Sequence, residues 1–62
     1  MREWLVRLRE AKGMTQKALA EQVKISQPSM CDIEQGVNTP RPDTAKRIAQ
    51  VLGFDWTRFF DK

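Results

Sequence analysis

Histidine is absent from the 62-residue sequence, and cysteine occurs once, as Cys31. A single cysteine forms no intrachain disulfide, and without histidine the chain lacks the usual ligands of a structural zinc site. No apolar run approaches the ~20 residues of a membrane-spanning helix. The first ten residues, MREWLVRLRE, interleave charges where a signal peptide needs an unbroken apolar stretch. We therefore expect a cytoplasmic protein with no metal, no cofactor and no membrane association.

The same shortages argue against an enzyme. Without histidine the most common general base is missing, and Cys31 has no partner base that the sequence reveals. Paired carboxylates and a phosphate-binding glycine loop are missing as well. A chain of 62 residues predicts one domain over residues 1–62, with no separate small-molecule effector domain. Such a small core gives only a small free energy of unfolding, and association with a second copy would increase it.

The chain carries a modest positive charge, with 11 Lys and Arg against 8 Asp and Glu, a net charge of +3. This balance suits a polyanionic partner such as nucleic acid, but many small proteins carry as much. Charge alone therefore leaves the partner open.

Apolar residues recur at helical spacing near the N-terminus, and no segment shows the alternation of a strand. The spacing predicts a first helix over residues 2–12, which Gly13 ends. Thr15 is placed to cap a second helix that ends near Val23, with Gln16 and other polar residues facing outward.

Only the three residues KIS separate this second helix from a third, which Ser26 caps and Gly36 ends. Pro28 is compatible with the first turn, where a missing amide hydrogen costs no intrahelical bond. Two helices of about two turns joined by a tight bend are the pattern of a helix-turn-helix unit.

Two further helices follow. Pro42 can begin the fourth, and Gly53 ends it. Asp55 can cap a fifth helix over residues 56–62, in which Phe54 and Phe59 have the spacing of a hydrophobic staple. The sequence therefore predicts an all-α fold of five short helices.

With its residues in this order, the sequence resembles the Cro and phage-repressor type of helix-turn-helix domain, also called the xenobiotic-response-element family, over nearly the whole chain. No single element of the pattern is specific, but the joint spacing is. The matching elements are Arg9, Thr15-Gln16, Leu19-Ala20, Ser26, Glu34-Gln35-Gly36, Pro40 and Ile48-Ala49-Gln50-Val51-Leu52. The resemblance implies a lambda-repressor-like fold and sequence-specific binding of double-stranded DNA, with the third helix in the major groove and the second across the backbone.

The resemblance assigns base-reading positions to the third helix. Gln27 can make the paired donor and acceptor contact that glutamine makes with adenine. Pro28 either contacts a thymine methyl or stiffens the start of the helix, and Asp32 either accepts from cytosine N4 or is a solvated charge. Cys31 is interpreted as a small residue near the groove wall. A redox role is disfavoured, because the chain has no second cysteine to form a disulfide with it.

Phosphate contacts are assigned in the same way. Gln16 resembles the family's phosphate clamp at the start of the second helix. Arg9 and Glu34 are different, because in relatives this pair forms a salt bridge that ties the first helix to the end of the third. We expect it to be architectural. Further phosphate candidates by position are Lys17, Ser29, Asn38, Thr39 and Arg41.

Lys24 departs from the family pattern, since relatives commonly have glycine at the bend between the second and third helices. A left-handed backbone is usual there and costs a non-glycine residue about 1 kcal/mol. Lys24 either tolerates this strain or belongs to a differently built bend.

The aromatic C-terminal segment bears on association. A helix of under two turns cannot bury Trp56, Phe59 and Phe60 together, so we expect at least one ring, with Phe60 the first choice, to lie in a homodimer interface. A dimer would let two reading helices contact half-sites about 34 Å apart, with repression as the output. The alternative is an antitoxin-like or anti-activator module whose aromatic end binds another protein.

Overall fold

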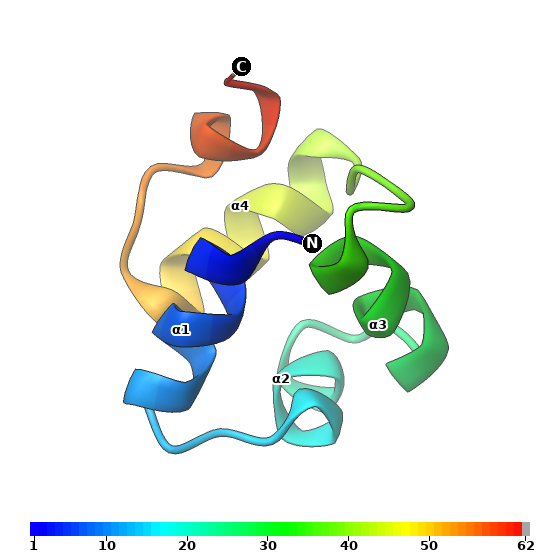
Figure 1. Cartoon of the computed structure of the whole chain (residues 1–62), viewed down its shortest axis with the longest axis vertical. Helices are drawn as coiled ribbons and strands as arrows, with labels where there is room; N and C mark the ends of the chain where they lie inside the picture. Colours follow the sequence, from blue (N-terminus) through cyan, green and yellow to red (C-terminus); the bar gives the residue numbers. More distant parts are fainter. Residues whose placement is uncertain (62) are drawn as a thin grey trace.

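The computed structural model describes residues 1–61, which form four α-helices and one 3-10 helix (Figure 1). The all-α prediction is therefore confirmed for the described residues. The elements are α1 Glu3–Ala11, α2 Gln16–Gln22, α3 Gln27–Gln35, α4 Pro42–Leu52 and the 3-10 helix η1 Trp56–Phe60.

The fifth helix differs from the prediction in type and extent. The amide of Arg58 donates to the carbonyl of Asp55 at 3.0 Å, which is the three-residue spacing of a 3-10 helix. A segment of five residues is too short for cooperative α-helix formation, and 3-10 geometry is common in such short pieces. The prediction also included Lys62, which lies outside the described residues.

The helix starts follow the predicted caps. The Thr15 hydroxyl accepts from the amide of Ala18 at 3.0 Å, and the Ser26 hydroxyl accepts from the amide of Ser29 at 3.2 Å. Each bond satisfies an amide that has no partner within its helix. At the other end of α3, Gly36 has φ 81°, a left-handed conformation that ends the helix without a Cβ clash.

Lys24 adopts the left-handed conformation expected at the bend between α2 and α3, with φ 63°. It is the one non-glycine residue with positive φ among residues 1–61. The bend therefore keeps its usual shape, and the lysine carries the strain.

A single hydrophobic cluster holds the helices together, with α2 packed on α3 and η1 on α4. Ala11, the last residue of α1, is apolar but lies outside this cluster and is exposed. The fully or nearly fully buried members are Leu5, Leu19, Ala20, Val23, Met30, Ile33, Ala45, Ile48, Leu52 and Phe59.

Three aromatic rings close the end of this core, where α1 meets η1. Trp4 lies 5.1 Å from Phe54 and 5.3 Å from Phe59, measured between ring centroids. Phe54 and Phe59 are 5.5 Å apart, so the predicted staple across the Asp55 cap is confirmed. Aromatic pairs at these separations add to the stability gained by burial alone.

Within residues 1–61, no helix combines the length and the hydropathy needed to cross a membrane.

Candidate nucleic-acid interface

The first turn of α3 is exposed. Gln27, Pro28 and Ser29 are all accessible to solvent, although the next residue, Met30, is fully buried. In Figure 1 this start of α3 lies at the edge of the molecule. The helix is therefore fixed through its inner face, while its first three side chains face outward.

Cys31 and Asp32, the other predicted base-reading residues, are half-buried. The Cys31 sulfur accepts from the side-chain amide of Gln35 at 3.5 Å. The Asp32 carboxylate accepts from the side-chain amide of Asn38 at 3.4 Å, and its carbonyl accepts from the amides of Val37 and Asn38. Asp32 therefore also holds the loop after α3, which neither of its predicted roles includes.

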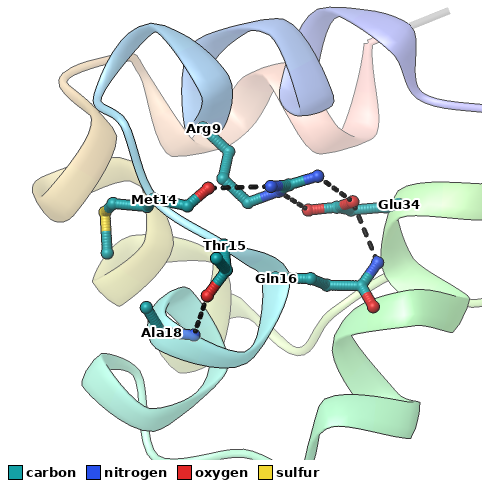
Figure 2. A network of polar contacts seen from close by, with 6 residues as sticks. All are labelled: Arg9, Met14, Thr15, Gln16, Ala18 and Glu34. Carbon is teal, nitrogen blue, oxygen red and sulfur yellow. Dashed lines mark hydrogen bonds and ion pairs between the residues drawn. The ribbon is translucent and has the colours of Figure 1, made fainter.

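The predicted ion pair between Arg9 and Glu34 is present in the interior (Figure 2). Arg9 Nε lies 2.7 Å from Glu34 Oε2, and Arg9 Nη2 lies 3.3 Å from Oε1. Arg9 Nη1 also donates to the carbonyl of Met14 at 2.8 Å. Glu34 is only 2% exposed, so the pair is enclosed by α1, α2 and α3.

Gln16 also reaches this pair, and it is half-buried instead of facing fully outward as predicted. Its Nε2 donates to Glu34 Oε1 at 3.1 Å (Figure 2). A side-chain amide carries two N–H donors and a carbonyl oxygen. One donor therefore remains for a ligand outside the protein while the other holds the side chain against Glu34.

The other phosphate candidates lie on the surface, and the side chains of three of them, Ser29, Asn38 and Thr39, form hydrogen bonds with neighbours. The Ser29 hydroxyl lies 2.8 Å from the Ser26 hydroxyl, and the Thr39 hydroxyl accepts from Arg2 Nη2 at 3.0 Å. All five candidates, Lys17, Ser29, Asn38, Thr39 and Arg41, are exposed.

Arg2 has a structural role that sequence reasoning missed. Its backbone amide donates to the carbonyl of Glu34 at 2.7 Å, and Nη1 donates to the carbonyls of Ile33 at 2.6 Å and Asn38 at 2.8 Å. Carbonyl acceptors at the end of a helix have no sequence signature. The one available signal was a cation before the first helix, and its partners are more than 30 residues away.

The aromatic C-terminal segment has one well-exposed ring. Phe60 is 47% exposed, as predicted, and its ring packs in a T-shaped arrangement with the half-buried Trp56 ring, with the two centroids 5.8 Å apart. Lys46 Nζ lies 5.0 Å from the centre of the Trp56 ring. Phe59, by contrast, is 6% exposed and packs in the core. The hydrophobic staple holds Phe59 in the core, so its ring has little exposed surface with which to contact a second copy. We therefore no longer include Phe59 in the expected dimer interface.

Comparison with known proteins gives two matches. The model of the helix-turn-helix family matches residues 5–59. The chain is also 41% identical over 61 residues to the uncharacterized HTH-type transcriptional regulator YqaF of Bacillus subtilis (strain 168), and the match covers 98% of this chain and 80% of that protein. No solved structure matches significantly.

Proposed function

Because this chain belongs to the Cro/C1-type helix-turn-helix family of DNA-binding transcriptional regulators, we propose that it is a cytoplasmic repressor that binds a palindromic operator as a homodimer. It folds as one domain. Its output is repression, since a protein bound at a promoter blocks polymerase.

The observation that carries the proposal is the contrast along α3. The side chains of its first turn are exposed, whereas Glu34 near its end is buried in an ion pair. A helix that enters the major groove by its N-terminal end requires this arrangement. Gln27 then reads adenine, and Pro28 and Cys31 contact the groove through apolar surface. Asp32 lies beside them and accepts from cytosine N4 or keeps the following loop in place.

Phosphate contacts flank this reading surface. The free N–H of Gln16 and the exposed side chains of Lys17 and Ser29 lie at the starts of α2 and α3. Asn38, Thr39 and Arg41 follow the end of α3. Contacts of this kind set the register of the protein on the duplex but carry no sequence information directly.

Selection of bound sequences from a random pool of double-stranded DNA tests the proposal. An enriched palindrome with half-sites about 34 Å apart is the expected result. Enrichment of a single asymmetric half-site would contradict the dimer, and no enrichment over the starting pool would contradict sequence-specific binding.

The dimer interface is proposed to include Phe60 and Trp56. Full burial of a phenylalanine side chain favours association by roughly 1.5 to 3 kcal/mol, and Phe60 has about half of its surface left to bury. Two such rings in a symmetric dimer give weak, concentration-dependent association once the entropy of association is subtracted. Lys46 beside Trp56 supplies a polar rim.

The Phe60→Glu variant should be a folded monomer that binds a half-site weakly and the full palindrome without cooperativity. Val37→Glu is the matched control, because Val37 is also an exposed apolar residue, at 68%, but lies outside η1. Sedimentation of both variants and the parent protein measures the difference. A monomeric parent would reject the interface and favour the alternative, in which the aromatic end binds a different protein.

A further inference from the structure

Arg2 connects three parts of the chain that are far apart in sequence. Through its backbone and side chain it contacts two carbonyls at the end of α3, those of Ile33 and Glu34. Its guanidinium also contacts the loop after α3, through the carbonyl of Asn38 and the hydroxyl of Thr39, and lies 5.5 Å from the centre of the Phe59 ring. Figure 1 shows the N-terminus lying beside the end of α3.

The contact with Thr39 has a chemical consequence. A threonine hydroxyl has one hydrogen to donate and two lone pairs that accept. Arg2 Nη2, at 3.0 Å, occupies one lone pair and, because it is a cation, polarises the O–H bond. The hydroxyl hydrogen must point away from the guanidinium, and Thr39 is exposed. The hydroxyl is thereby prepared to donate to an anion in solvent.

We infer that Arg2 is a positioning residue that holds the loop after α3 and orients the Thr39 hydroxyl as a donor to a DNA phosphate, an inference that rests on the proposed function. Arg2 need not touch DNA to do this. Both Nη1 hydrogens are taken by the two carbonyls, and the side chain is half-buried.

The geometry explains why arginine is needed at this position. The guanidinium is a planar fork with five N–H donors in fixed directions, so it can bind two carbonyls and a hydroxyl on different segments at once. A lysine ammonium keeps the charge but is a compact point donor on a flexible stem. Arg2→Lys therefore removes the positioning while leaving the net charge, and with it the general attraction to DNA, unchanged.

The experiment is a double-mutant cycle between Arg2→Lys and Thr39→Val. Binding is measured to random-sequence double-stranded DNA of about 20 base pairs, long enough for two half-sites, at a temperature where circular dichroism shows every variant folded. Arg2→Gln is made alongside and replaces Arg2→Lys if the lysine variant melts too early. Arg7→Lys is the matched control, because Arg7 lies nearby on α1 with a side chain that is 79% exposed. Thr39→Ser tests rescue, since serine keeps the hydroxyl.

Loss of one hydrogen bond to a phosphate predicts binding about three- to tenfold weaker for each bound subunit, for Arg2→Lys and for Thr39→Val alike. The double variant should be no weaker than the weaker single variant, because both changes remove the same contact. Arg7→Lys and Thr39→Ser should bind like the parent protein.

Three results would overturn the inference. In the first, Thr39→Val binds like the parent protein. In the second, the two losses multiply, so that Thr39 contributes equally with and without Arg2. In the third, Arg2→Lys lowers only the melting temperature, as a merely structural residue would. A parent protein that fails to bind the duplex would instead overturn DNA binding itself, so the two failures are distinguishable.

Discussion

The two ends of α3 differ in what holds them. At its start, the Ser26 cap and the buried Met30 fix the backbone, while Gln27 and Pro28 extend into solvent. At its end, the buried Glu34 carboxylate accepts from Arg9 and Gln16, and Arg2 binds the last carbonyls. These contacts hold the C-terminal end of the helix, and the side chains of its first turn remain accessible to a ligand.

This division separates the part of α3 that stabilises the fold from the part proposed to read DNA, within nine residues. A buried carboxylate is costly unless it is paired and its remaining lone pairs are satisfied, so the end of α3 tolerates little change. The exposed first turn has no such constraint, and its side chains can change without loss of the fold. We expect substitutions at the two ends to affect different measurements.

Arg9→Ala should give the largest effect. Removing one partner of a buried pair leaves a buried charge and costs about 3 to 5 kcal/mol, a large part of the stability of a small domain. Arg7→Ala is the control, because its pair with Glu3, at 3.7 Å, is exposed and worth only about 0 to 1 kcal/mol. Thermal melting of both variants measures the difference. An unchanged melting temperature with a weaker salt dependence of DNA binding would instead make Arg9 a phosphate contact.

Gln27→Ala tests the exposed first turn of α3. We expect binding to the preferred DNA site to weaken by about 1 to 3 kcal/mol, because a bidentate contact to adenine is lost, while the melting temperature and non-specific affinity stay unchanged. Gln50→Ala is the control, since Gln50 is an exposed glutamine on a different helix, α4. Equal losses on specific and random DNA, measured by titration, would reject base reading by Gln27.

Lys24→Gly tests the bend between α2 and α3, which leads into the exposed first turn of α3. The left-handed backbone destabilises a folded non-glycine residue by about 1 to 2 kcal/mol, and glycine removes this strain. Glycine also increases the conformational entropy of the unfolded chain, which lowers the free energy of unfolding by about 0.4 to 1 kcal/mol. We therefore expect a net gain in stability of about 0.5 kcal/mol, measured by denaturant unfolding.

Lys12→Gly is the matched control, because Lys12 caps the end of α1 with φ −85° and has no such strain to lose. This variant should be destabilised. If both substitutions lower the free energy of unfolding, strain at Lys24 is not significant.

The caps and stops of the helices could be predicted from the sequence because they depend on local chemistry. Thr15, Ser26 and Asp55 each bond an amide two or three residues away, so the spacing alone identifies them. The Arg9 and Glu34 pair followed from the family resemblance and is present. Their contact with each other spans 25 residues, and no periodic pattern would have revealed it.

The missed features are long-range contacts to groups that the sequence does not distinguish. Arg2 binds backbone carbonyls, which every residue has, and Gln16 turns toward Glu34 because the packing of α2 on α3 brings them together. The 3-10 form of η1 depends on its short length and its packing against α4. Such outcomes are decided by the tertiary fold, whereas sequence patterns report mainly local preference.

Asp55 should give the smallest effect, and it tests whether the charged cap at the start of η1 stabilises the fold. The Asp55 carboxylate is exposed and accepts from the backbone amide and the hydroxyl of Thr57, and these two bonds, the backbone bond first, lower its pKa below the ordinary value of 3.8. Because the folded state holds this proton less tightly than the unfolded chain, the stabilisation is complete above about pH 4 and is lost as the pH falls through the folded pKa.

Asp55→Ala should therefore lower the melting temperature slightly at neutral pH, while Asp55→Asn, an equally good cap, should not. The difference between the parent protein and Asp55→Ala should shrink as the solution is made more acidic than about pH 4. A difference that stays constant through this acid range, measured by circular dichroism melting, would mean that the charged cap does not stabilise η1.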